Sequence, residues 1–186
     1  MERSVKGSLF VDYVRMLRAR KNVDWSRYLE PQDIPFLNAR ILPDGWYPMA
    51  TFARFGLAIL DEIVLGDPFL ARAWGAMSAD QLASSEPGIL VQRDPRESLM
   101  RLLVLRRSFF NFEVIDFPQL TDEHADVKVN YEMSPRAEHA ACLQTLGFFC
   151  RLVELAGGQN VTGHLGLRSW EGDPTTTFTV DWESPE

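Results

Sequence analysis

The first 110 residues carry apolar side chains at the spacing of helices. Apolar positions recur every three or four residues, which is typical of a helix with one buried face. We expect longer helices at 5–21, 49–65, 68–74 and 95–110, and shorter ones at 25–29, 32–40 and 78–84. The Pro-Asp-Gly turn at 43–45 precedes the second long helix, and we expect Trp46 and Tyr47 to pin it to the core.

Beyond residue 110 the apolar positions alternate, which is typical of strands. We expect strands at 112–117, 127–131, 161–167 and 175–182, with a polar connection at 121–126. A helix at 136–156 separates the second strand from the third; Ser134 caps its start, and Gly157 with Gly158 ends it. The last two strands form a hairpin, in which Phe178, Val180 and Trp182 share one face.

These elements predict an α+β fold. A helical part, at about 1–110, packs on a small antiparallel sheet with a long helix between its strands, at about 111–183. The length of 186 residues suits a single domain, 1–186, that buries a core of its own.

Composition narrows the classes of function. The net charge of −7 argues against a nucleic-acid partner. The chain has no run of about 20 apolar residues that could span a membrane. Residues 1–6 are polar, unlike the start of a signal peptide. We therefore expect a cytoplasmic protein.

The sequence contains no catalytic motif. It lacks a Gly-x-Ser-x-Gly elbow, a P-loop and a Gly-x-Gly-x-x-Gly turn, so we predict that it is not an enzyme. His139 and Cys142 share a helix face and are weak metal candidates, but zinc normally takes four ligands. We expect no metal, because Cys142 fits a buried stripe with Leu146, Phe149 and Val153. Cys150 is expected to be buried and inert.

The segment Tyr131-Glu-Met-Ser134-Pro-Arg136 resembles a motif of heme-NO/oxygen-binding (H-NOX) domains, Tyr-x-Ser-x-Arg, in which a strand enters a helix. In that family the three side chains bind the heme propionates. The start at Val5-Lys-Gly7-Ser-Leu-Phe10, the order of elements and the length are also similar over nearly the whole chain. The layout looks closer still to uncharacterised myxobacterial paralogues, which share this plan with 4-vinyl-reductase-type ligand-binding domains. The resemblance implies an H-NOX-like fold.

The chain departs from the H-NOX pattern at two points. One extra residue separates Tyr131 from Ser134, so the motif is Tyr-x-x-Ser-x-Arg. The family also places its iron-binding His on a helix roughly thirty residues before the Tyr, whereas residues 97–107 contain no His. The nearby His124 is expected in a loop. We therefore expect no heme and no other cofactor.

We predict a heme-free sensory or regulatory ligand-binding module. The side chains that we expect to line a pocket for a small apolar ligand are Phe52, Phe55, Trp74, Leu102, Phe109 and Phe149. The alternative for each of them is an ordinary place in the hydrophobic core. The motif adds Tyr131, Ser134 and Arg136, of which Arg136 would face an anionic group of the ligand. Because the chain ends soon after Trp182, we expect its signal to pass to a non-covalent protein partner; a homodimer stays open.

Three alternatives stay open. The first is an interaction or scaffold protein with a filled core and no ligand. The second is a heme-based gas sensor with a displaced axial ligand such as His124 or Cys142. The third is a small enzyme that acts on a hydrophobic substrate.

Overall fold

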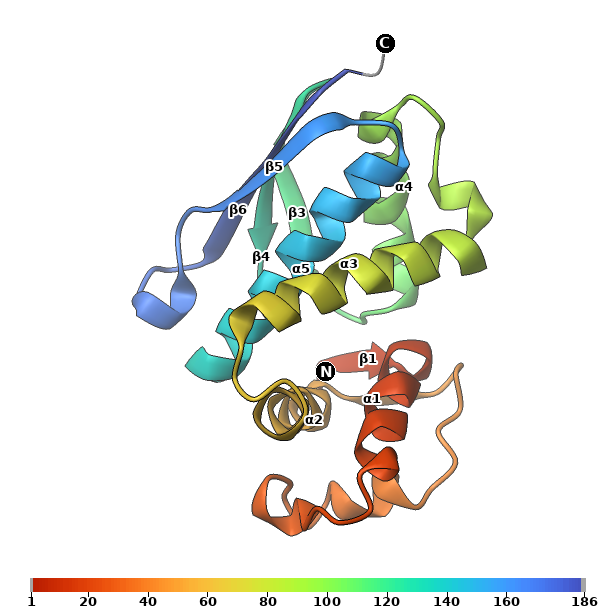
Figure 1. The fold of residues 1–186 in the computed structure, drawn as a ribbon, viewed down its shortest axis with the longest axis vertical. Helices are drawn as coiled ribbons and strands as arrows, with labels where there is room; N and C mark the ends of the chain where they lie inside the picture. Colours follow the sequence, from red (N-terminus) through yellow and green to blue (C-terminus); the bar gives the residue numbers. More distant parts are fainter. Residues whose placement is uncertain (1, 185–186) are drawn as a thin grey trace. The chain divides into compact units, whose positions relative to one another are not determined.

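The structure, a computed structural model, describes residues 2–184 except for the side chain of Pro68. Its contacts divide the chain into two compact units (Figure 1). The first runs through Asp67 and includes Arg107–Phe112, and the second contains Pro68–Arg106 and the chain from Glu113 onward. Residues 68–106 therefore group with the strands, whereas the sequence pattern placed them in the helical part.

The first unit consists of two helices and two short strands. Strand β1 (Ser4–Lys6) pairs antiparallel with β2 (Trp46–Pro48). The helices are α1 (Gly7–Ala19) and α2 (Met49–Glu62). Single 3-10 turns, η1 (Trp25–Arg27) and η2 (Ile34–Leu37), stand where longer helices were expected. A β-bridge between Val5 and Phe110 joins the segment Arg107–Phe112 to β1.

The turn at 42–45 packs directly on the start of α1. Gly7 N–H donates to the Gly45 carbonyl at 2.9 Å, and a Cβ on Gly7 would lie 2.0 Å from the Leu42 carbonyl oxygen. The prediction that Trp46 pins this turn to a core was wrong: 45% of it is exposed, and Lys6 Nζ lies 4.5 Å from its ring centroid. Tyr47 does pin the turn, because its hydroxyl accepts a hydrogen bond from Leu42 N–H at 2.9 Å.

Phe10 is the centre of an aromatic core that joins α1 to α2. Its buried ring lies with its centroid 4.9 Å from Phe55, 5.2 Å from Tyr47, 5.7 Å from Phe36 and 6.3 Å from Phe52. Ring pairs of this kind each contribute about 0.5–1.5 kcal/mol beyond the burial of their area.

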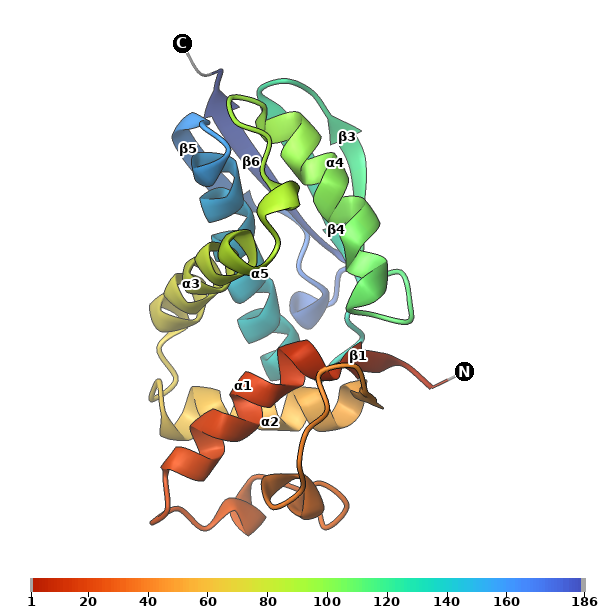
Figure 2. The same cartoon turned by 90° about the vertical axis from the view of Figure 1, so that its right-hand side faces the viewer.

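The second unit is a four-stranded antiparallel sheet with helices packed on it. The strand order is β3 (Ile115–Leu120), β4 (His124–Val129), β6 (Thr176–Glu183) and β5 (Gln159–Leu165). Helix α5 (Pro135–Leu155) connects β4 to β5 and packs on the sheet, and α3 (Pro68–Ser85) packs against α5 (Figure 1). Helix α4 (Pro95–Leu105) lies beside β3 (Figure 2). The 3-10 turns of this unit are η3 (Pro87–Ile89) and η5 (Ser169–Glu171), and a third, η4 (Arg106–Ser108), begins at Arg106, after which the chain returns to the first unit.

Several element boundaries differ from the prediction. Helix α3 is continuous, although two pieces were expected, because Gly75 lies where α3 meets α5: a Cβ there would be 1.8 Å from the Gln144 carbonyl oxygen. Strand β4 begins at His124, inside the expected polar connection, because His124 pairs with Asp181 of β6. Helix α4 ends at Leu105 and gives way to a 3-10 turn instead of continuing to Phe110.

The core of the second unit lies between α5 and the sheet. Phe178, Val180 and Trp182 are buried, as the alternation of the last strand predicted. The predicted stripe of α5 is also confirmed, because Cys142, Leu146, Phe149 and Val153 are all buried. The rings of Phe149 and Phe178 meet at 5.5 Å between centroids. The α+β class is thus confirmed, and no helix within residues 2–184 is long and apolar enough to cross a membrane.

Candidate functional site

The turn between β4 and α5 carries the motif that the sequence singled out. Tyr131 is buried, and its hydroxyl lies 2.6 Å from Thr145 Oγ1 on α5. Thr145 donates its own hydroxyl proton to the Ala141 carbonyl at 2.7 Å. Since a threonine has one proton to donate, Tyr131 is the donor in the first bond. Its phenol proton is therefore committed to the helix that follows the motif.

Glu138 holds the start of α5, a role that sequence reasoning missed. Its carboxylate is buried and accepts a hydrogen bond from Met133 N–H at 2.9 Å. The expected cap, Ser134, makes no side-chain hydrogen bond to the helix. The missed signal is an acidic residue in the first helical turn, which can reach back to a backbone N–H that precedes the helix.

The extra residue of the motif is accommodated by strained backbone. Glu132 has a φ of 57°, in the left-handed region that a non-glycine residue rarely adopts. Ser134 and Arg136 after it are exposed, whereas Tyr131 is buried. The turn therefore sends the tyrosine into the core and leaves the serine and the arginine at the surface.

The apolar pocket candidates fall in both units. Phe52, Phe55 and Phe109 belong to the first unit, where Phe52 and Phe55 surround Phe10. Phe109 is half-buried, and its carbonyl accepts from Lys6 N–H at 2.8 Å. The second unit contains the other three: half-buried Trp74 on α3, buried Leu102 on α4, and buried Phe149 on α5.

All three histidines lie in the second unit. His124 Nδ1 lies 2.6 Å from Asp181 Oδ1, and its Nε2 lies 3.2 Å from Asp126 Oδ1. The hydrogen bond to Asp181, with help from Asp126, raises the pKa of His124 even though burial opposes it. His139 is exposed and stacks on Trp170 at 4.6 Å between centroids. His164 is exposed on β5.

The two cysteines are free, buried thiols. Burial, with a smaller contribution from the charge of Glu138, raises the pKa of Cys142 to about 12. Burial also raises the pKa of Cys150, although the guanidinium of Arg72 opposes the shift. Neither thiol is set up as a nucleophile or as a thiolate ligand near neutral pH. Among residues 2–184 no group of three or more His, Cys, Asp and Glu side chains could hold a metal ion.

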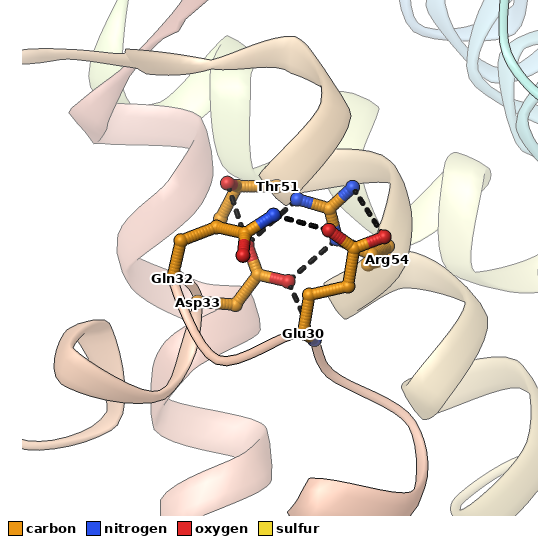
Figure 3. A network of polar contacts seen from close by, with 5 residues as sticks. All are labelled: Glu30, Gln32, Asp33, Thr51 and Arg54. Carbon is orange, nitrogen blue, oxygen red and sulfur yellow. Dashed lines mark hydrogen bonds and ion pairs between the residues drawn. The ribbon is translucent and has the colours of Figure 1, made fainter.

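The first unit contains a network of polar contacts around Asp33 (Figure 3). Arg54 donates to both carboxylate oxygens, from Nε at 2.5 Å and from Nη2 at 2.9 Å. Thr51 Oγ1 donates at 2.7 Å and Glu30 N–H at 3.0 Å. Burial alone would raise the pKa of Asp33, but these hydrogen bonds outweigh it and lower the pKa. With four donors on one carboxylate, the network is a structural clamp rather than a binding site.

Comparison with known proteins identifies the architecture. No family model and no curated protein matches the chain. Among solved structures, the Fe(II)NO form of an H-NOX protein from S. oneidensis is similar with a TM-score of 0.62 and 13% identity, over 96% of this chain and 99% of that one. The unliganded Fe(II) form of the A71G mutant of the K. algicida H-NOX protein is similar with a TM-score of 0.61 and 14% identity, over 96% of this chain and 97% of that one. The chain has an H-NOX-like fold.

A third H-NOX structure, which probes the function of heme distortion, is similar with a TM-score of 0.59 and 11% identity, over 97% of this chain and 96% of that one. The residues of this chain do not fit a heme held as the motif implies. Helix α4 contains no His that could bind the iron. Both ring nitrogens of His124 face carboxylates, and the proton of Tyr131 goes to Thr145.

Proposed function

We propose that the chain is a heme-free sensory or regulatory module that binds a small apolar ligand and passes its signal to a non-covalent protein partner. One observation carries the proposal: an H-NOX-like fold over 96% of the chain in which α4 contributes no histidine. Because heme iron in this kind of site is held by a protein axial ligand, the loss of that ligand removes the basis for gas sensing.

Native mass spectrometry of gently purified protein tests the ligand. We expect a species heavier than the 21.2 kDa chain, which loses a small non-heme molecule when the protein is denatured. A spectrum that shows only the bare chain, both as purified and after incubation with a lysate lipid extract, would contradict the ligand-binding proposal.

A second candidate function is an interaction protein with a filled core. It is favoured by apolar side chains on the surface of α4, where Met100 is 42% and Val104 is 73% exposed, one helical turn apart. A bare chain in the mass spectrum, together with specific capture of one protein that Val104→Glu abolishes, would favour this candidate.

A further inference from the structure

The two edges of the four-stranded sheet differ in how they are protected. Strand β3 carries Pro118 within it, and its register shifts between Asp116 and Gln119. Proline, charge and a bulge are the usual devices that prevent another strand from pairing with an edge. Helix α4 also lies beside β3. This edge is therefore closed to pairing.

Strand β5 at the other edge lacks most of these devices. Its sequence, Gln159–Leu165, contains no proline and no Asp, Glu, Lys or Arg. It has a bulge between Gln159 and Thr162, after which Thr162–Leu165 pair regularly with β6. Among the described residues, the side of these four residues away from β6 has no hydrogen-bond partner.

The alternation of peptide groups along a strand shows which backbone groups of β5 point to the open edge of the sheet. Gly166 N–H donates to the Thr177 carbonyl of β6 at 2.8 Å. Peptide groups alternate in direction along a strand, so those of Thr162 and His164 also point to β6. The N–H and C=O groups of Gly163 and Leu165 consequently point to the open edge, with Val161 and Leu165 half-buried on the helix side.

Arg72 of α3 lies beside this edge without an acidic partner. Its Nη2 is 3.7 Å from Cys150 Sγ, and a Cβ placed on Gly163 would be 3.5 Å from the same nitrogen. Arg72 is half-buried, and no carboxylate among residues 2–184 lies within ion-pair distance of it. A half-buried guanidinium usually has a carboxylate partner, because it costs free energy to remove it from water.

We propose that β5 accepts an extended segment of a partner protein, whose acidic side chain lies opposite Gly163 and pairs with Arg72. Cys150 Sγ and Leu146 Cδ1 fill the space directly above Gly163, and Arg72 Nη2 lies next to them. Apolar residues two positions to either side of the acidic residue would pack on Val161 and Leu165. The segment thus has the pattern apolar-x-acidic-x-apolar. A second copy of this chain fits less well, because antiparallel pairing about Gly163 would bring the two Arg72 side chains together.

This inference rests on the proposed function in that it specifies the chemistry of the protein partner, and its test does not depend on the small ligand. The probes are two capped peptides, Thr-Val-Thr-Glu-Thr-Val-Thr and the same peptide with Gln in place of Glu. Each is titrated to millimolar concentration into the full ¹⁵N-labelled chain, and the Gly163 amide signal is followed. We expect the Glu peptide to bind about tenfold more tightly than the Gln peptide, as for a charge-assisted hydrogen bond.

Arg72→Gln keeps the methylene groups of the side chain and should abolish the preference for Glu. Arg151→Gln is the matched control, because Arg151 on α5 already pairs with Asp80 and Glu154 at 2.9 Å each. It should leave the preference unchanged. The proposal is overturned if neither peptide shifts Gly163, or if the preference survives in Arg72→Gln. It is also overturned if the free protein sediments as a dimer in which the Gly163 amide is protected from exchange.

Discussion

At the scale of single residues, the Asp33–Arg54 pair stabilises the first unit most directly. The Asp33 side chain is fully buried, and Arg54 binds it through two nitrogens. Asp33→Asn removes the buried counter-charge of Arg54, which keeps only the exposed Glu30 carboxylate at 3.5 Å, and should cost about 2 kcal/mol of unfolding free energy. Asp12→Asn, which breaks an exposed pair with Arg15, should cost less than about 1 kcal/mol. Equal losses in urea titrations followed by tryptophan fluorescence would show that the clamp adds nothing.

The Asp33–Arg54 pair should also make the free energy of unfolding depend on pH in the acid range. The folded-state pKa of Asp33 is lowered below its unfolded value near 3.8, because its hydrogen bonds outweigh burial. This contribution is present above the unfolded pKa and is lost as the pH falls through the folded pKa. Urea midpoints measured at pH values from 6 to 2 should therefore fall less steeply for Asp33→Asn than for the natural chain. Parallel curves would contradict this assignment.

The contribution of His124 to stability should depend on pH in the opposite direction to that of Asp33. Its pKa is raised, chiefly by the hydrogen bond to Asp181, so its contribution is full below the unfolded pKa of about 6.5 and is lost as the pH rises through the folded value. The contribution of His124 to the unfolding free energy should stay below about 1 kcal/mol, because His124, Asp126 and Asp181 are partly exposed. An NMR titration of the natural chain and of Asp181→Asn should show a lower His124 midpoint in the variant. An unchanged midpoint would mean that the contact is not formed.

At the scale of elements, the close approach of α3 and α5 depends on Gly75 of α3 and Gly147 of α5. A Cβ on Gly147 would lie 2.0 Å from the Arg72 carbonyl oxygen, which is backbone and cannot move aside cheaply. Gly147→Ala should therefore lower the melting temperature by roughly 5–10 °C. Gly88→Ala is the matched control, since nothing lies within 4 Å of the added carbon. Calorimetry that finds the two variants equally stable would refute this account of the packing.

The element boundaries show what the sequence can and cannot predict. Alternation alone predicted the buried face of β6, because every second residue of that strand faces α5. The sequence pattern predicted a helix that ends at Trp74, yet α3 continues through Gly75, where the contact with α5 requires a residue without a side chain. The start of β4 was missed for a similar reason: His124 and Asp126 are polar but pair with β6. Contacts between distant segments decided both cases.

At the scale of the whole molecule, local patterns predicted the α+β class, and the resemblance to a known family implied the fold, but neither predicted the polar clusters. The resemblance to H-NOX domains, in the motif from Tyr131 to Arg136 and in the order of elements, implied an H-NOX-like fold, which the comparison with solved structures confirmed. The Asp33–Arg54 clamp joins residues 21 positions apart, and no periodicity connects them. The carboxylate of Glu138 was missed because the preceding Ser134 looked like a sufficient cap.

Whether this H-NOX-like fold lacks heme is tested most directly by absorption spectroscopy. The full chain is expressed with a heme precursor in the medium and then purified, and its heme content per chain is measured alongside that of an H-NOX protein prepared in the same way. We predict no Soret band for this chain and a strong one for the comparison protein. A Soret band with about one heme per chain, lost in His124→Ala or Cys142→Ala, would contradict the account and identify a displaced axial ligand.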